Sequence, residues 1–168
     1  MTACEVPVMQ HPDTRLAPTC EIRRVLYSDM NKMPEFSPMV ERYADESAIP
    51  GMPRPNRQSQ MYLHMEQANL IHWAGAFVDG RLVGFVSLLA SVLPHYGAMV
   101  GTTESFFVEP EYRKTGAGKM LLREAEKIAA SLGAVALLVS APSGGRLEAV
   151  LPRSGYQESN RVFFRRLG

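Results

Sequence analysis

The residues best suited to chemistry lie between positions 106 and 119, where two glycines stand among basic side chains. Gly116 and Gly118 let the backbone turn its amides outward, and neither has a β-carbon that would keep a phosphate away. The basic residues beside them are Arg113, Lys114 and Lys119. Amides and charge together predict a diphosphate site, against the alternative of an ordinary loop with solvated basic residues.

Two other phosphate motifs fit this stretch poorly. A P-loop requires G-x-x-x-x-G-K-[ST], but Arg113 stands at the first glycine position and Met120 at the hydroxyl position. A dinucleotide fingerprint requires a third glycine where this chain has Leu121. Both readings are therefore weak.

The elements around the two glycines favour phosphate binding. Apolar residues over 99–108 predict a strand that ends before Pro110, because proline cannot donate a ladder hydrogen bond. Apolar residues at helical spacing predict a helix over 118–132, capped by Gly133. The positive end of this helix dipole would lie at the glycines, where it favours an anion.

Periodicity and turn residues predict the remaining elements. Asp79-Gly80 between two apolar runs indicates a hairpin turn. The continuous apolar run 134–139 predicts a strand covered on both faces at the centre of the sheet. The other expected elements are a strand at 22–27, helices at 38–47 and 56–69, strands at 73–78 and 81–89, a short helix at 146–151 and a final strand at 161–166.

The segment Arg113–Gly118 matches [RQ]-x-x-G-x-[GA], and in this the chain resembles the GNAT (Gcn5-related N-acetyltransferase) family. The order of the elements resembles that family from about residue 21 onward. The resemblance implies an α/β fold: a mixed, mostly antiparallel sheet of six to seven strands flanked by helices. Its two central strands, ending at Val108 and Val139, would splay to admit acetyl-CoA. Residues 21–168 would form the single domain, preceded by an irregular leader at 1–20.

The same resemblance assigns the donor site. The loop amides would hold the diphosphate of acetyl-CoA, the backbone of Val108 would pair with pantetheine, and the amide of Phe106 would face the thioester carbonyl. The expected CoA-binding residues are Phe106, Phe107, Val108, Arg113, Lys114, Thr115, Gly116, Ala117, Gly118 and Lys119.

Glu104 is the expected catalytic base. It stands two residues before Phe106, so strand alternation predicts that both side chains share one face of the sheet. Many family members carry a glutamate there, which removes the proton of the attacking amine directly or through water. The alternative is a glutamate that pairs with an arginine or is solvated at a sheet edge.

Two positions depart from the family pattern. The usual acid is a tyrosine where this chain has Leu151, and Gly144 replaces the usual asparagine. Nothing local selects among Tyr96, His95 and Tyr112 as a substitute acid. The leading hypothesis is direct acetyl transfer to a primary amine in a ternary complex, and the alternative is a non-catalytic acyl-CoA-binding module.

Composition restricts the partners. The 168 residues have a net charge of +1, which argues against a nucleic-acid partner, and no apolar run is long enough for a membrane span. Two cysteines, Cys4 and Cys20, predict no disulfide framework and fit a cytoplasmic location. No histidine has a second ligand at metal spacing, so no metal is expected. The acceptor remains a small molecule or a protein amine, selected by loop 50–55 and residues 94–96, and a homodimer is left open.

Overall fold

The computed structural model describes residues 19–167. Cys4 and most of the expected leader lie outside that range, and the first strand already begins at Cys20, inside the segment expected to be irregular. The strands are β1 (Cys20–Val25), β2 (Ile71–Val78), β3 (Arg81–Leu93), β4 (Ala98–Val108) and β5 (Ala136–Leu138). The helices are α1 (Tyr27–Met30), α2 (Phe36–Ser47), α3 (Ser59–Gln67), α4 (Ala117–Ser131) and α5 (Arg146–Val150), with 3-10 turns η1 (Pro110–Tyr112) and η2 (Pro152–Ser154).

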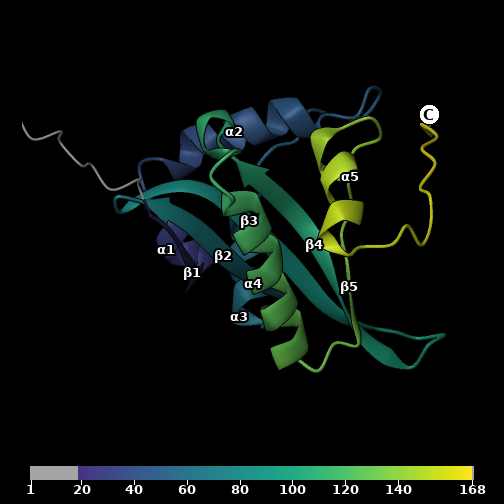
Figure 1. Cartoon of the computed structure of the whole chain (residues 1–168). Helices are drawn as coiled ribbons and strands as arrows, with labels where there is room; N and C mark the ends of the chain where they lie inside the picture. Colours follow the sequence, from purple (N-terminus) through teal and green to yellow (C-terminus); the bar gives the residue numbers. More distant parts are fainter. Residues whose placement is uncertain (1–18, 168) are drawn as a thin grey trace, which may run out of the picture.

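The strands form one sheet in the order β1-β2-β3-β4-β5 (Figure 1). Neighbouring strands are antiparallel except β4 and β5, which are parallel. Asp79 and Gly80 join β2 to β3 with φ values of 50° and 77°, as the Asp-Gly signal predicts for a tight hairpin turn.

Helix α4 covers one face of the sheet (Figure 1). Its apolar stripe, which includes Leu121, Ala125 and Ile128, packs on Val86 and Leu88 of β3. The helix approaches closely at Gly101, where a β-carbon would lie 2.9 Å from Ala129 Cβ. The expected amphipathic helix is therefore confirmed, and its position fixes the loop that precedes it.

The opposite face is covered by α1, α2 and α3 and has an aromatic core. Tyr27, Phe36, Trp73 and Phe85 are almost fully buried there, in edge-to-face or tilted contacts with ring centroids 5.3–6.2 Å apart. The short helix α1 was not expected from the sequence, and it begins at Tyr27, the last residue of the expected strand at 22–27.

The prediction of six to seven strands is wrong for the described residues, which form five. The expected final strand at 161–166 has no regular structure; Val162 and Phe163 are 91% and 89% exposed. The expected central strand over 134–139 is likewise a three-residue edge strand, β5. So short an edge offers few backbone groups, which explains why no further strand pairs with it.

None of the helices among residues 19–167 has both the length and the apolar character needed to cross a bilayer.

Candidate functional site

The candidate site begins where β4 and β5 separate. The two strands pair only from Val100 to Thr102 on β4. The side chain of Thr103 then takes over the pairing, since its Oγ1 donates to the Leu138 carbonyl at 3.5 Å and accepts the Ser140 N–H at 3.3 Å. Beyond Thr103 no strand among residues 19–167 lies along the outer edge of β4, so this half of the strand keeps a free edge.

The free edge includes the backbone of Phe106 and Val108. The Glu109 N–H donates to the Val83 carbonyl at 2.9 Å, so odd-numbered residues of this part of β4 face β3. Alternation then directs the peptide groups of Phe106 and Val108 outward. The Val108 carbonyl accepts Arg113 Nε–H at 2.8 Å, whereas Phe107 points its ring toward the aromatic core.

The loop after β4 presents amides at the start of α4. Gly116 has φ +88°, a left-handed conformation with open space around it, so glycine is required by the turn and nothing obstructs a ligand. Thr115 fixes the loop internally, with its Oγ1 donating to the Tyr112 carbonyl at 2.8 Å and accepting the Ala117 N–H at 3.4 Å. Amides without a protein acceptor among the described residues belong to Lys114, Gly116, Gly118 and Lys119.

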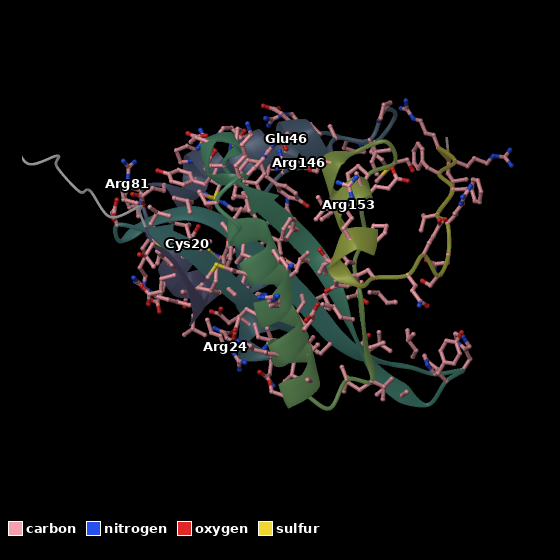
Figure 2. The ribbon with its side chains drawn as sticks, viewed as in Figure 1. Cys20, Arg24, Glu46, Arg81, Arg146 and Arg153 are labelled. Atoms are coloured by element: carbon pink, nitrogen blue, oxygen red, sulfur yellow. The ribbon has the colours of Figure 1, made fainter. Side chains whose placement is uncertain are left out.

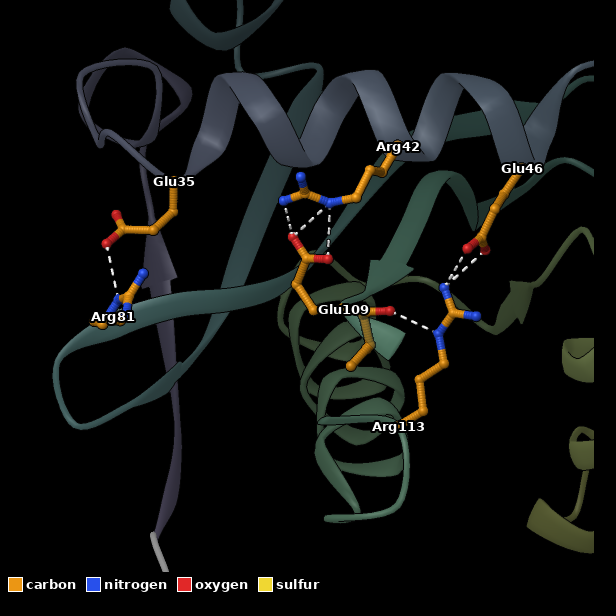
Figure 3. A network of polar contacts seen from close by, with 7 residues as sticks. Glu35, Arg42, Glu46, Arg81, Glu109 and Arg113 are labelled. Carbon is orange, nitrogen blue, oxygen red and sulfur yellow. Dashed lines mark hydrogen bonds and ion pairs between the residues drawn. The ribbon is translucent and has the colours of Figure 1, made fainter. Parts of the chain in front are cut away.

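Arg113 was expected to add positive charge for a diphosphate, and the structure differs at this residue. Its guanidinium donates to both carboxylate oxygens of Glu46 on α2, at 2.6 and 2.7 Å, and lies 5.4 Å from the Phe107 ring centroid (Figure 3). The guanidinium is therefore already paired within the protein, because the Glu46 carboxylate of α2 competes with a diphosphate for it. Lys114 and Lys119 are exposed and carry the free charge of the loop.

A basic cavity of about 160 Å³ lies beside α4. Three cations, Lys119, Arg123 and Arg153, line it, together with Tyr156, whose hydroxyl donates to Glu126 at 2.6 Å. Arg153 comes from η2, next to α5 (Figure 2). Arg123 and Arg153 were not among the expected site residues; the i,i+4 spacing of Lys119 and Arg123 on one helix face was the available signal.

Glu104 lies at a β-bulge, which changes the face that it occupies. Ser87 pairs with Ser105 and Leu88 with Thr103, so Glu104 has no cross-strand partner. Its carboxylate accepts hydrogen bonds from Tyr62 Oη at 2.9 Å, from Ser87 Oγ at 2.9 Å and from Ser105 Oγ. Glu104 is therefore on the α1–α3 face.

Phe106 instead packs with the α4 core, so the prediction that Glu104 and Phe106 share a face is wrong. Simple alternation fails here because the extra residue of the bulge shifts the period. The two residues lie on opposite sides of one strand, two positions apart, at the place where β4 has its free edge.

Tyr62, which donates a hydrogen bond to Glu104, is a candidate site residue that was not expected from the sequence. Burial, followed by the charge of Glu104 and its hydrogen bond, raises the pKa of Tyr62 well above its usual value. The phenol therefore keeps its proton at neutral pH and can donate it to the carboxylate. No motif marks Tyr62, because only the packing of α3 brings it to β4.

The position of the family's usual acid has no group that could donate a proton. Leu151 is a half-buried residue between α5 and η2, without a hydroxyl. His95 and Tyr96 stack on each other at the turn joining β3 to β4, and Tyr96 is 71% exposed. Neither residue lines the basic cavity beside α4, and the selection of the acceptor by residues 94–96 stays a prediction. Among residues 19–167, no group of three His, Cys, Asp or Glu side chains could hold a metal ion.

Ion pairs fasten α2 to the end of β4. Arg42 binds both carboxylate oxygens of Glu109, which is 7% exposed, and its Nε–Oε2 distance is 2.9 Å (Figure 3). Arg81, at the start of β3, lies 3.5 Å from Glu35 just before α2. Behind the loop, Arg146 of α5 donates to the Arg113 carbonyl at 3.2 Å. The loop between β4 and α4 is thus held by α2 on one side and by α5 on the other.

Comparisons with known proteins agree on one family. A model of the acetyltransferase (GNAT) family matches residues 36–150. A ribosomal-protein-alanine N-acetyltransferase from Brucella melitensis biovar Abortus 2308 is 23% identical, with 89% of this chain and 100% of that chain covered and a TM-score of 0.68. An acetyltransferase from Trypanosoma brucei is 21% identical, with 89% and 100% covered and a TM-score of 0.62.

The aminoglycoside acetyltransferase AAC(6')-Iy, in complex with a bisubstrate analogue that contains CoA, is 19% identical. The alignment covers 89% of this chain and 99% of that one, with a TM-score of 0.69. At these identities the solved structures establish the fold alone. No curated protein matches the sequence.

Proposed function

Because this chain belongs to the GNAT acetyltransferase family, we propose that it transfers an acetyl group from acetyl-CoA to a primary amine. One observation carries the proposal: the free edge of β4 joins the loop of unpartnered amides on one side and Glu104 on the other. A thioester lying along that edge would have its phosphates at the loop and its carbonyl between Phe106 and the carboxylate.

Donor binding would use backbone groups first. The free amides of Lys114, Gly116, Gly118 and Lys119 and the dipole of α4 would hold the diphosphate, with the side chains of Lys114 and Lys119 adding charge. The basic cavity formed by Arg123 and Arg153 is suited to the 3′-phosphate of CoA. The outward peptide groups of Phe106 and Val108 would pair with the pantetheine arm.

Acetyl transfer would proceed by direct attack. The neutral amine attacks the thioester carbonyl, a C–N bond forms as the C–S bond breaks, and the proton of the amine passes to Glu104, directly or through a water molecule. CoA leaves as a thiolate, which takes a proton from solvent because Leu151 provides none. No nucleophilic cysteine is needed; Cys20 is partly buried on the edge strand β1, which β2 and β3 separate from β4.

A second candidate is a non-catalytic acyl-CoA-binding module, favoured by Leu151 and Gly144 at the positions of the usual tyrosine and asparagine. The two functions predict different outcomes when acetyl-CoA is incubated with a panel of amines. An enzyme releases free thiol only when an acceptor amine is present, and a binding module protects acetyl-CoA without releasing thiol. The panel should include small amines, amino acids, an aminoglycoside and peptide amines.

The remaining expectations stay predictions. They are a cytoplasmic location, a single domain over 21–168, a homodimer, and the absence of a nucleic-acid partner and of a metal.

A further inference from the structure

A second cavity lies next to Glu104, between the sheet and the segment that joins α2 to α3. Its volume is about 60 Å³, which is enough for water or a small polar group. The segment contributes Pro55, Asn56 and Arg57, and Ser105 of β4 contributes to the wall. Its aromatic lining consists of Tyr27, Phe36, Tyr43, Tyr62, Trp73 and Phe85. A compact group of a ligand would fill this space, with the rest of the molecule at its mouth.

Two side chains of the wall carry buried donors without a partner. Trp73 is 4% exposed, and neither its Nε1–H nor the buried Nη1–H of Arg57 finds an acceptor among the described residues. Indole and guanidinium nitrogens only donate, so both would be satisfied by a group that only accepts. Two phenols of the same wall already have partners: Tyr27 donates to Ser59 Oγ at 2.9 Å, and Tyr62 donates to Glu104.

Among groups that only accept hydrogen bonds, the positive charge of Arg57 favours an anion. Arg54, three residues earlier, pairs with Glu41 at 3.0 Å and Asp45 at 2.8 Å. Arg57, in contrast, meets no carboxylate of residues 19–167; it donates only to Ser37 Oγ at 3.4 Å and lies 5.6 Å from the Phe36 ring centroid. A half-buried cation without a counter-ion is stabilised when a ligand supplies one.

We propose that this cavity binds a carboxylate that belongs to the acceptor itself, so that the substrate is a small primary amine bearing a carboxylate, of the amino-acid type. This inference rests on the proposed function, which supplies the acetyl transfer to the amine. Tyr62 separates the two charged ends of the site: its ring lines the cavity and its hydroxyl binds Glu104. The carboxylate would meet Arg57 and Trp73 while the amine lies near Glu104. Diamines and polyamines lack the anionic end.

Trp73 is the only tryptophan of the chain, so its fluorescence reports on the cavity without any acetyl transfer. The protein is titrated with amino acids, with the matching decarboxylated amines and amino-acid amides, and with inorganic phosphate. The acids are expected to change Trp73 fluorescence and the other compounds to bind at least tenfold more weakly. Arg57→Gln should weaken binding of the acids roughly 10- to 100-fold and leave the amides unaffected. Arg23→Gln, at an exposed arginine of β1 that pairs with Glu21, is the control and should leave binding of the acids unchanged.

The two proposals fail in different ways. Binding of acids that depends on Arg57, without thiol release from acetyl-CoA, would support the carboxylate site and contradict acetyl transfer. Acetyl transfer to decarboxylated amines with the same kcat/KM as to the parent acids, unchanged in Arg57→Gln, would overturn the carboxylate site. Tighter binding of phosphate than of every acid would overturn it as well. Arg57→Lys, which keeps the charge, should retain part of the affinity and controls for misfolding of the loop.

Discussion

The two faces of the sheet offer different polar groups to a ligand. On the α4 face these are mainly backbone amides of one short loop, whereas on the α1–α3 face they are side chains from three segments. The loop depends on Gly116 and on the start of a helix, both of which are local in sequence. The other half depends on Arg57, Tyr62 and Glu104, which meet only after the helices pack on the sheet. The comparison predicts that the first half decides whether CoA binds and the second half decides what happens to it.

The largest effect is expected at Glu104. Glu104→Gln removes the proposed proton acceptor but keeps the size of the side chain, so kcat should fall by about 10²- to 10⁴-fold while CoA affinity is unchanged. Steady-state kinetics and calorimetry measure the two quantities, and Glu21→Gln on β1 serves as a control for an exposed glutamate. Wild-type turnover in Glu104→Gln would assign the residue to structure and leave solvent as the base.

At Gly118 the expected loss is in CoA affinity. A β-carbon there would lie 3.5 Å from Phe106 Cζ and 3.8 Å from Val108 Cγ2, ordinary contacts that the fold tolerates. Gly118→Asp should therefore fold, helped by a carboxylate at the helix N-terminus, yet repel the diphosphate and weaken CoA binding by about 100-fold, or ~2.7 kcal/mol. Calorimetry with CoA tests this, with Gly118→Ala as the neutral control. Unchanged affinity in a folded Gly118→Asp protein would remove the loop from the proposal.

A smaller effect is expected from Tyr62→Phe. The variant keeps the ring that lines the cavity and loses the hydroxyl that donates to Glu104 at 2.9 Å. We expect kcat to fall about tenfold, since a hydrogen bond to a charged group contributes roughly 1.5–3 kcal/mol, and CoA affinity to stay the same. Tyr43→Phe is the matched control on the same wall. Equal losses in both variants would point to packing rather than to the hydrogen bond with the carboxylate.

The ion pairs that hold α2 should have the smallest effect on activity and act instead on stability. Glu109 is buried and bound by two nitrogens of Arg42, so Glu109→Ala should lower the free energy of unfolding by about 2 kcal/mol. Glu46→Ala removes the partner of Arg113 at a more exposed position and should cost about 1 kcal/mol or less. Urea denaturation measures both. A larger loss for Glu46→Ala would show that Arg113 holds the loop more strongly than its exposure indicates.

Predictability from the sequence follows the same division. The helix over 117–131, the Asp79-Gly80 turn and the loop with Gly116 depend on neighbours in the chain, so periodicity and turn chemistry identified them. Arg57 and Tyr62 were missed because their roles come from contacts between elements far apart in sequence. The loop at 50–55 was expected to select the acceptor; the structure places Pro55 at the cavity, while Arg54 is tied to α2.

Two errors have an identifiable cause. The face of Glu104 was inferred from strict alternation, and a bulge of a single residue leaves no pattern in the sequence that would reveal it. The final strand at 161–166 was inferred from apolar residues, yet a strand also needs a partner edge, and β5 is only three residues long. Apolar composition alone could not supply that information.

The bulge also bears on how a fold of this kind can change its chemistry over evolutionary time. Every residue of β4 except Glu104 has a partner on β3, and replacing a paired residue risks the alignment of the two strands. Glu104 projects from the position at which the ladder is already interrupted, so a mutation there leaves the pairing intact. A lineage can therefore exchange the side chain proposed as the base, or lose it, while the sheet and the loop before α4 persist.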